Sequence, residues 1–266
     1  MRVTLEAAGV GPILREWRQR RRLSQLDLAL DAGISTRHLS FVETGRSRPS
    51  PDMVLHLAEQ LEVPLRDRNS LLLAAGYAPQ YDERSLDDPD MAQIRDALGR
   101  VLDGHEPFPA IAVDRYWTLA ASNAALGVLV EGVADWLLEP PVNALRMALH
   151  PEGMAPRVLN FPEWRAHLLH KVDRAVAMIG DPRLVELQEE LLGYPEPPAP
   201  EQTSPGAEVM FGLKLAAPGD GAELSFFSTI TTFGTPHDIT VSELAIEAFF
   251  PADERTARVL AELAAA

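Results

Sequence analysis

The stretch Ser24–Pro51, SQLDLALDAGISTRHLSFVETGRSRPSP, decides the fold of the N-terminal part of this chain. Ser24 and Ser35 each stand where a serine side chain caps the start of a helix. Gly33 lies between them and supplies the positive φ with which the first helix ends. The alanines just before this glycine are small enough for two helices to cross closely. The pattern predicts a helix-turn-helix, whose second helix enters the DNA major groove.

Helical patterns on both sides of this stretch complete an expected domain over residues 1–79. One helix is expected at 12–22 before the motif, and two more at 50–61 and 64–75 after it. Arginines crowd the C-terminal half of the helix at 12–22. Such a run is usually a solvated face, but beside a helix-turn-helix it favours phosphate contact. The expected fold class of this part is an all-α, five-helix DNA-binding domain.

The charge of the chain is distributed unevenly, although the total is −15. Residues 1–75 carry 11 Lys/Arg against 9 Asp/Glu, a net of +2, whereas residues 76–266 carry 13 against 30, a net of −17. Phosphate contact needs a local basic face and not a basic whole protein. The acidic part would repel non-specific DNA, so the N-terminal part is the expected contact.

Several classes of protein are not expected. The chain has no cysteine, which excludes disulfides and Cys-ligated zinc. It has no run of 18 apolar residues, so we expect no membrane span and a cytoplasmic location. Motifs of the G-x-S-x-G, H-E-x-x-H or P-loop type are absent, and we expect neither catalytic residues nor a cofactor. The pair His167 and His170 lacks further ligands, so no metal site is expected either.

The motifs QxxLAxxAGIS (residues 25–35) and LSxxExGR (residues 39–46) resemble the XRE family of phage-repressor and Cro-like DNA-binding domains, over residues 11–76. The resemblance implies a structural salt bridge between Arg18 and Glu43. It also implies that Gln25 contacts a phosphate of the DNA. The base edges would be contacted by Thr36, Arg37 and Ser40, and the DNA backbone by Arg46 and Ser47.

The chemistry of these side chains agrees with the implied roles. Arg37 can present two N–H groups to guanine O6 and N7, and Ser40 lies one helical turn from Thr36 on the same face. One such domain offers few contacts. We therefore expect a homodimer on a double-stranded operator whose half-sites lie about 34–36 Å apart.

The stretch from Pro79 to Pro89 is polar, acidic and bounded by prolines, and residues 80–90 are expected to form a linker to a second domain at 91–266. This domain is expected to be α+β, with helices between a hairpin and a three-stranded meander. Its helices are expected at 91–103, 123–130, 134–138, 143–149, 162–179, 182–192 and 256–265, and its strands at 110–113, 117–121, 208–216, 223–233 and 239–249.

The motifs VDRYW (113–117), AxNAA (121–125), NALR (143–146) and FxxW (161–164) resemble the MmyB-like ligand-binding domain of bacterial regulators. The resemblance implies a PAS-like fold and a small apolar, fatty-acyl-like ligand. Expected apolar liners of its pocket are Trp117, Met147, Trp164, Phe227 and Phe233, and expected polar anchors are Arg146, His150, His167 and His237. Arg146 suits a carboxylate head group. Each of these residues also has a structural interpretation, as core or as surface.

The sequence thus predicts a transcriptional regulator that binds DNA and senses a small apolar molecule. We expect this protein to need no cofactor, apart from a bound fatty acid or a similar apolar effector. Two alternatives stay open at this point. One is a DNA-bound scaffold whose second domain only dimerises. The other is an enzyme fused to a regulatory helix-turn-helix.

Overall fold

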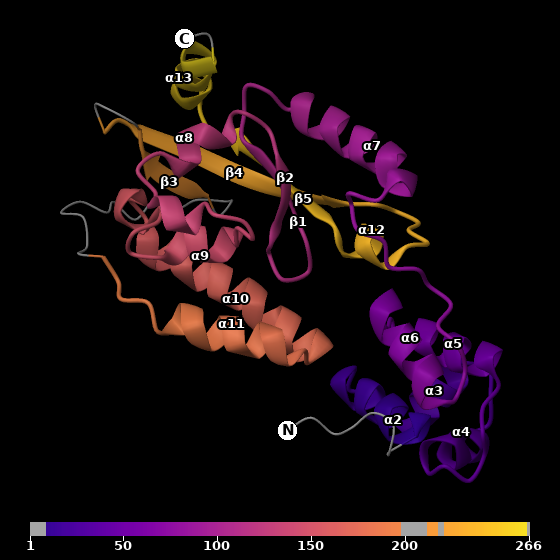
Figure 1. Cartoon of the computed structure of the whole chain (residues 1–266). Helices are drawn as coiled ribbons and strands as arrows, with labels where there is room; N and C mark the ends of the chain where they lie inside the picture. The colour runs from indigo at the N-terminus through magenta and orange to yellow at the C-terminus, as the bar shows by residue number, and fades with distance from the viewer. Residues whose placement is uncertain (1–8, 198–211, 218–220, 265–266) are drawn as a thin grey trace. The chain divides into compact units, whose positions relative to one another are not determined.

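The chain forms two compact units (Figure 1), and the computed structural model describes residues 9–197, 212–217 and 221–264. Unit 1 consists of Met1–Ser85 together with Thr235–Ser242, and unit 2 consists of Leu86–Gly234 together with Glu243–Ala266. The residues expected to form a linker, 80–90, are therefore divided between the two units.

Unit 1 contains the helix-turn-helix and the helices expected around it. The helices described in its segment Met1–Ser85 are α2 (Val10–Arg20), α3 (Gln25–Asp31), α4 (Thr36–Glu43), α5 (Pro51–Gln60) and α6 (Leu65–Ala74). The Ser24 hydroxyl accepts a hydrogen bond from the Asp27 N–H, and the Asp27 carboxylate accepts one from the Ser24 N–H. Ser35 caps α4 in the same position, and Gly33 has a φ of 63°. The all-α fold predicted for this region is confirmed.

The start of α2 packs directly on the end of α4 at Gly11. A Cβ atom at this position would lie 2.5 Å from the Val42 carbonyl oxygen and 2.6 Å from that of Glu43. Real Cβ atoms do not approach backbone oxygens so closely, so a side chain here must push the two helices apart. The glycine is therefore required for the contact between them.

We expect Gly11→Ala to lower the free energy of unfolding of unit 1 by about 1–3 kcal/mol, because over-packing against backbone cannot be relieved by a side-chain rotation. Gly99→Ala is the matched control: it lies within α7 (Ala92–Asp103), and its Cβ would meet nothing within 4 Å. That change should raise the stability of unit 2 by about 0.5–1 kcal/mol. Hydrogen exchange measures the free energy of unfolding of each unit separately. Equal effects of the two substitutions would contradict the close contact between α2 and α4 at Gly11.

Unit 2 is built on a five-stranded antiparallel sheet with the strand order β2-β1-β5-β4-β3. The hairpin β1 (Ala110–Val113) and β2 (Leu119–Ser122) joins the meander β3 (Leu213–Ala216), β4 (Glu223–Thr232) and β5 (Ala245–Pro251) through the pairing of β1 with β5. This order places chain segments more than a hundred residues apart on adjacent strands. The α+β class predicted for this domain is confirmed, whereas the more specific expectation of a PAS-like fold stays a prediction.

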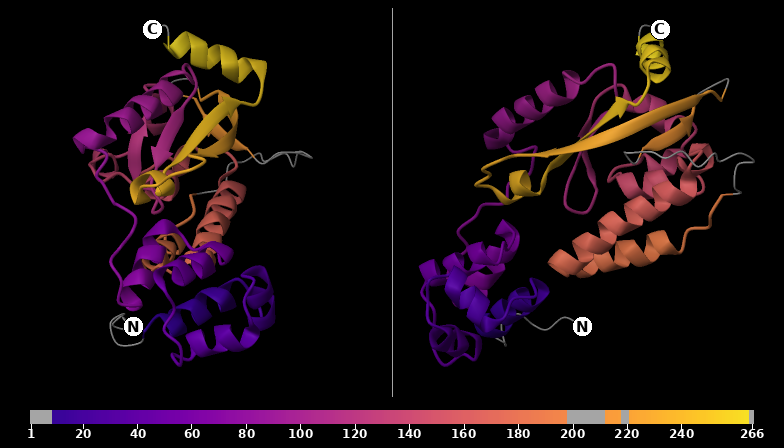
Figure 2. Two further views of the ribbon diagram at one scale, coloured as in Figure 1. Left: turned by 90° about the vertical axis from the view of Figure 1, so that its right-hand side faces the viewer. Right: turned by 180° about the vertical axis from the view of Figure 1, so that it is seen from behind.

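Helices cover both faces of this sheet (Figure 2). On one face lie α10 (Phe161–Ile179) and α11 (Pro182–Leu192), which contribute to the larger hydrophobic core, and on the other lies α7. The remaining helical segments described are η1 (Pro89–Met91), α8 (Leu126–Val130), η2 (Asp135–Leu137), α9 (Ala144–Leu149), η3 (Ala155–Arg157), α12 (Ile239–Glu243) and α13 (Glu254–Ala264). In the described part of the chain, none of the helices combines the length and the apolar character that crossing a membrane requires.

The expected strand at 239–249 is wrong in its first half. Its first residues, Ile239–Glu243, form the short helix α12, and β5 begins only at Ala245. The Asp238 carboxylate accepts a hydrogen bond from the Thr240 N–H, which is the contact of a helix cap. The β-branched residues after Asp238 favour a strand, but the cap decides the local structure. Of the strand expected at 208–216, residues 208–211 lie outside the described residues.

Within unit 1, the segment Thr235–Ser242 contacts Asp82 and Arg84, near the end of the segment Met1–Ser85. The Asp238 carboxylate forms an ion pair with Arg84 and accepts a hydrogen bond from its guanidinium at 3.2 Å, and the Ile239 N–H donates to the Asp82 carbonyl oxygen at 2.8 Å. Thr240 donates through its hydroxyl to the Arg84 carbonyl oxygen at 2.7 Å. These contacts tie the connection between β4 and β5 to the residues that follow α6.

Candidate functional site

The first candidate site is the exposed face of α4. Thr36 and Arg37 lie in its first turn and Ser40 in its second; Arg37 is exposed, and the other two are half-buried. The guanidinium groups of Arg37 and Arg46 lie 5.3 Å and 5.9 Å from the centre of the same aromatic ring, that of Phe41. The structure thus gathers two cations that the sequence placed nine residues apart. Such a pair suits contact with a base edge and with a neighbouring phosphate.

Gln25, the first residue of α3, is half-buried and forms a hydrogen bond within the protein. Its side-chain amide donates to Glu43 at 2.8 Å, and Arg18 donates twice to the same carboxylate, at 2.7 Å and 2.9 Å. Burial would raise the pKa of Glu43, but the hydrogen bonds from Arg18 and Gln25 outweigh burial and lower this pKa below its usual value. The salt bridge implied by the family resemblance is present. It joins α2, α3 and α4 and so fixes the angle at which α4 is presented.

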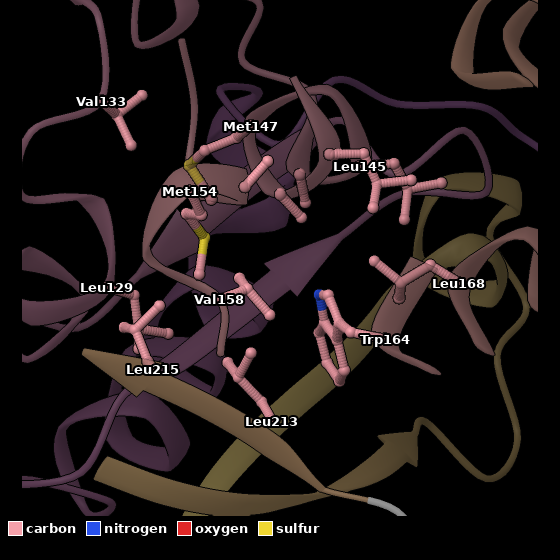
Figure 3. Close-up of a cluster of buried hydrophobic side chains, with 14 of the residues drawn as sticks. Leu129, Val133, Leu145, Met147, Met154, Val158, Trp164, Leu168, Leu213 and Leu215 are labelled. Atoms are coloured by element: carbon pink, nitrogen blue, oxygen red, sulfur yellow. The ribbon is translucent and has the colours of Figure 1, made fainter. Parts of the chain in front are cut away.

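The second candidate site is an apolar cavity of ≈ 40 Å³ in unit 2, between the sheet and the helices α8 to α10. Figure 3 shows part of its wall: Met147 and Met154 lie next to each other, and Trp164 and Leu168 project from α10 opposite them. The lining residues are Ile111, Trp117, Leu126, Leu129, Ala144, Leu145, Met147, Ala148, Met154, Trp164, Leu168, Leu213, Glu247 and Phe249. Three of the expected apolar liners, Trp117, Met147 and Trp164, are among them.

The expected anchors lie elsewhere. Arg146 forms a bidentate ion pair with Glu190, at 2.8 Å and 2.7 Å, and does not line the cavity. His150 packs edge-on against Trp136 and Tyr194, with ring centres 4.9 Å apart in each case.

His237 is exposed and belongs to unit 1, so it is separate from this cavity. His167 is not in the lining, but its ring stacks on that of the lining residue Trp164 with centres 6.0 Å apart.

Phe227 and Phe233 are not cavity residues, and this expectation is corrected. Phe227 pairs with Phe250 across β4 and β5, and the two rings stack with centres 5.2 Å apart. Successive residues of a strand face opposite sides of a sheet, so Phe226 belongs to the core on the cavity side and Phe227 to the other side. Phe233 follows the end of β4 and does not contribute to the lining.

Sequence reasoning missed the polar corner of the cavity. Glu247 on β5 lines the cavity, and its carboxylate accepts from Lys171 on α10 at 3.2 Å and from Ser228 on β4 at 2.7 Å. Burial, followed by the nearby charge of Lys171, lowers the pKa of His167 beside this group. No local signal marks this corner, because its members come from three elements that meet only in the folded sheet.

Two further residues that position the cavity wall were also missed. Arg157 donates to the carbonyl oxygens of Glu131 at 2.7 Å and Ala216 at 2.9 Å, which ties the end of α8 to β3. The Asn160 side-chain amide donates a hydrogen bond to the Gly212 carbonyl oxygen, and its oxygen accepts one from the Lys214 N–H. Their signal was weak, since an arginine or an asparagine in a loop usually faces solvent.

The matches to known families support a DNA-binding transcriptional regulator with a ligand-sensing domain. Residues 14–67 match the helix-turn-helix family, and residues 94–263 match the family described as MmyB-like transcription regulator ligand binding domain. The second match covers more than half of the chain, and the chain belongs to this family. Both resemblances identified from the sequence motifs are thereby confirmed. A comparison with curated proteins gave no match.

Proposed function

We propose that the protein is a homodimeric regulator in which α4 reads an operator sequence and the cavity of unit 2 binds an apolar effector. The observation that carries the first part is the cluster of Arg37 and Arg46 around Phe41 on an exposed face held by the buried Arg18–Glu43 pair. Two such faces on two half-sites supply the contacts that a single domain lacks.

The second part rests on the composition of the cavity. Its wall is almost wholly apolar, with a few polar groups at one corner, as in sites for small apolar ligands. Its volume of ≈ 40 Å³ is far below the roughly 300–1,000 Å³ of pockets that hold such ligands. A ligand must therefore displace side chains, and the flexible thioethers of Met147 and Met154 are suited to this movement. Binding thus changes the packing of unit 2, which is the differential contact that an effector needs.

Replacement of Arg37 by alanine tests the DNA-reading face. Loss of a bidentate base contact should weaken binding to a selected duplex by about 1–3 kcal/mol, roughly 5- to 150-fold, without unfolding unit 1. Arg174→Ala is the matched control, because Arg174 is an exposed arginine of α10 in unit 2. Competition binding with selected and scrambled duplexes measures the difference. Equal affinities of Arg37→Ala and Arg174→Ala for the selected duplex would sink the assignment.

Filling the cavity tests the ligand site. Ala148 lines the cavity, so Ala148→Phe should occupy the space and abolish uptake of an apolar molecule. Ala177→Phe, on an exposed part of α10, adds the same ring outside the cavity. Native mass spectrometry, followed by denaturation and extraction, should find a small apolar adduct on the wild type and on Ala177→Phe but not on Ala148→Phe. An adduct on all three proteins would place the ligand elsewhere.

A further inference from the structure

The cavity has one carboxylate in its wall, and that carboxylate has an unused oxygen. The Glu247 side chain is 13% exposed. The hydrogen bonds from Lys171 and Ser228 both reach Oε1, and among the hydrogen bonds of the described residues none reaches Oε2. A carboxylate offers about four acceptor positions, so Oε2 can accept a hydrogen bond from a bound molecule.

The charges of this corner already balance. Lys171 provides one positive charge against the one negative charge of Glu247, and the lowered pKa of His167 favours its neutral form near pH 7. A ligand carboxylate would add an unpaired negative charge directly beside Glu247. Glu247 already neutralises the charge of Lys171, so the positive charge of a ligand ammonium would be left without a partner. Burial of an unpaired charge is strongly unfavourable, so both kinds of head group are disfavoured.

The arginine expected to anchor a carboxylate head group, Arg146, is also engaged. The guanidinium of Arg146 is held by both oxygens of Glu190 and lies outside the lining. A carboxylate head group therefore gains no free cation from this residue.

We propose that the effector is an apolar molecule with a neutral hydrogen-bond donor at its polar end, an alcohol or a phenol, which donates to Glu247 Oε2. This inference rests on the proposed ligand site and specifies the chemistry that the site selects. It replaces the fatty-acid head group implied by the family resemblance with a hydroxyl group.

The test uses the full chain, freed of bound molecules by extraction, and four ligands built on the same ten-carbon chain. These are 1-decanol, decanoate, decylammonium and methyl decanoate at pH 7, and Trp117 and Trp164 in the lining report binding by fluorescence. We expect 1-decanol to bind at least about tenfold more tightly than decanoate, decylammonium and the methyl ester. In Glu247→Gln, Lys171 loses its partner, so decanoate should gain affinity and 1-decanol should lose its advantage.

Two further variants keep the test decisive. Lys171→Gln leaves the negative charge of Glu247 without its cation, so it should strengthen the binding of decylammonium and weaken that of decanoate. This variant gives a second readout if Glu247→Gln does not fold. Glu186→Gln, at an exposed position of α11, should leave all four affinities unchanged.

The outcomes separate this inference from the function on which it rests. If decanoate or the methyl ester binds as tightly as 1-decanol, or if Glu247→Gln leaves the ratios unchanged, the head-group assignment is wrong while the apolar site stands. If none of the four ligands binds, the proposed ligand site fails and the assignment fails with it.

Discussion

Glu43→Ala is expected to lower the free energy of unfolding of unit 1 by about 3–5 kcal/mol, the cost of breaking a buried ion pair by removing one partner. The Glu43 side chain is 1% exposed and that of Arg18 10% exposed. Without the carboxylate, Arg18 keeps its charge in the interior, and the amide of Gln25 loses its acceptor. The α2, α3 and α4 helices all lose a contact, so the face of α4 is disturbed as well.

Hydrogen exchange of the amides in α2 to α4 measures this effect separately from unit 2. Glu59→Ala, at an exposed position of α5, is the control and should change stability by less than about 0.5 kcal/mol. The pH dependence provides a second check. Because the folded state lowers the pKa of Glu43, its contribution is present above the unfolded value of about 4.3 and is lost as the pH falls through the lower folded value. Unaltered protection in Glu43→Ala, or an acid response identical to the wild type, would refute this account of the pair.

Asn123→Ala is expected to destabilise unit 2 by about 3 kcal/mol or more, since each buried polar group left without a partner costs about 1–3 kcal/mol. The buried amide of Asn123 donates to the carbonyl oxygens of Phe108 at 2.7 Å and Leu102 at 3.2 Å. Its oxygen accepts from the Ala110 N–H at 2.9 Å. One side chain therefore joins the end of α7, the start of β1 and the turn after β2.

Ser122→Ala is the matched control for this substitution, because Ser122 is the exposed neighbour on β2. Hydrogen exchange should show a large loss of protection in α7 and β1 for Asn123→Ala and almost none for Ser122→Ala. Similar exchange in the two variants would mean that the buried amide is not what holds these elements together.

Unit 1 could be predicted in detail because its signals are local. The caps at Ser24, Ser35 and Ser50 and the glycine at position 33 lie within a few residues of the backbone groups that they satisfy. The family resemblance added the Arg18–Glu43 pair, which spacing would not have revealed, because its partners lie on different helices. Gln25 shows the limit of this reasoning: the residue expected to contact a phosphate also donates to Glu43.

The cavity could be predicted only in part because its wall is assembled from distant strands. Trp117 and Trp164 belong to family motifs and line the cavity. Phe227 was misassigned because the sequence does not fix which residues of a strand face which side, and a shift by one residue reverses the face. Glu247 could not be anticipated at all, since its role depends on the pairing of β5 with β1 and on the approach of Lys171 from α10.

The central claim, that one molecule reads DNA through α4 and senses an apolar effector in unit 2, is tested most directly by one affinity measurement. The Kd of the full chain for a duplex selected from a random library is measured at fixed salt against a scrambled duplex, first without a ligand and then with each of the four ligands named above at saturation. We expect the selected duplex to bind about 10³-fold or more tightly than the scrambled one. We also expect 1-decanol to change that Kd about fivefold or more in the wild type and not in Ala148→Phe. Equal binding of both duplexes, or a Kd that neither 1-decanol nor decanoate, decylammonium or methyl decanoate changes in the wild type, would contradict the claim.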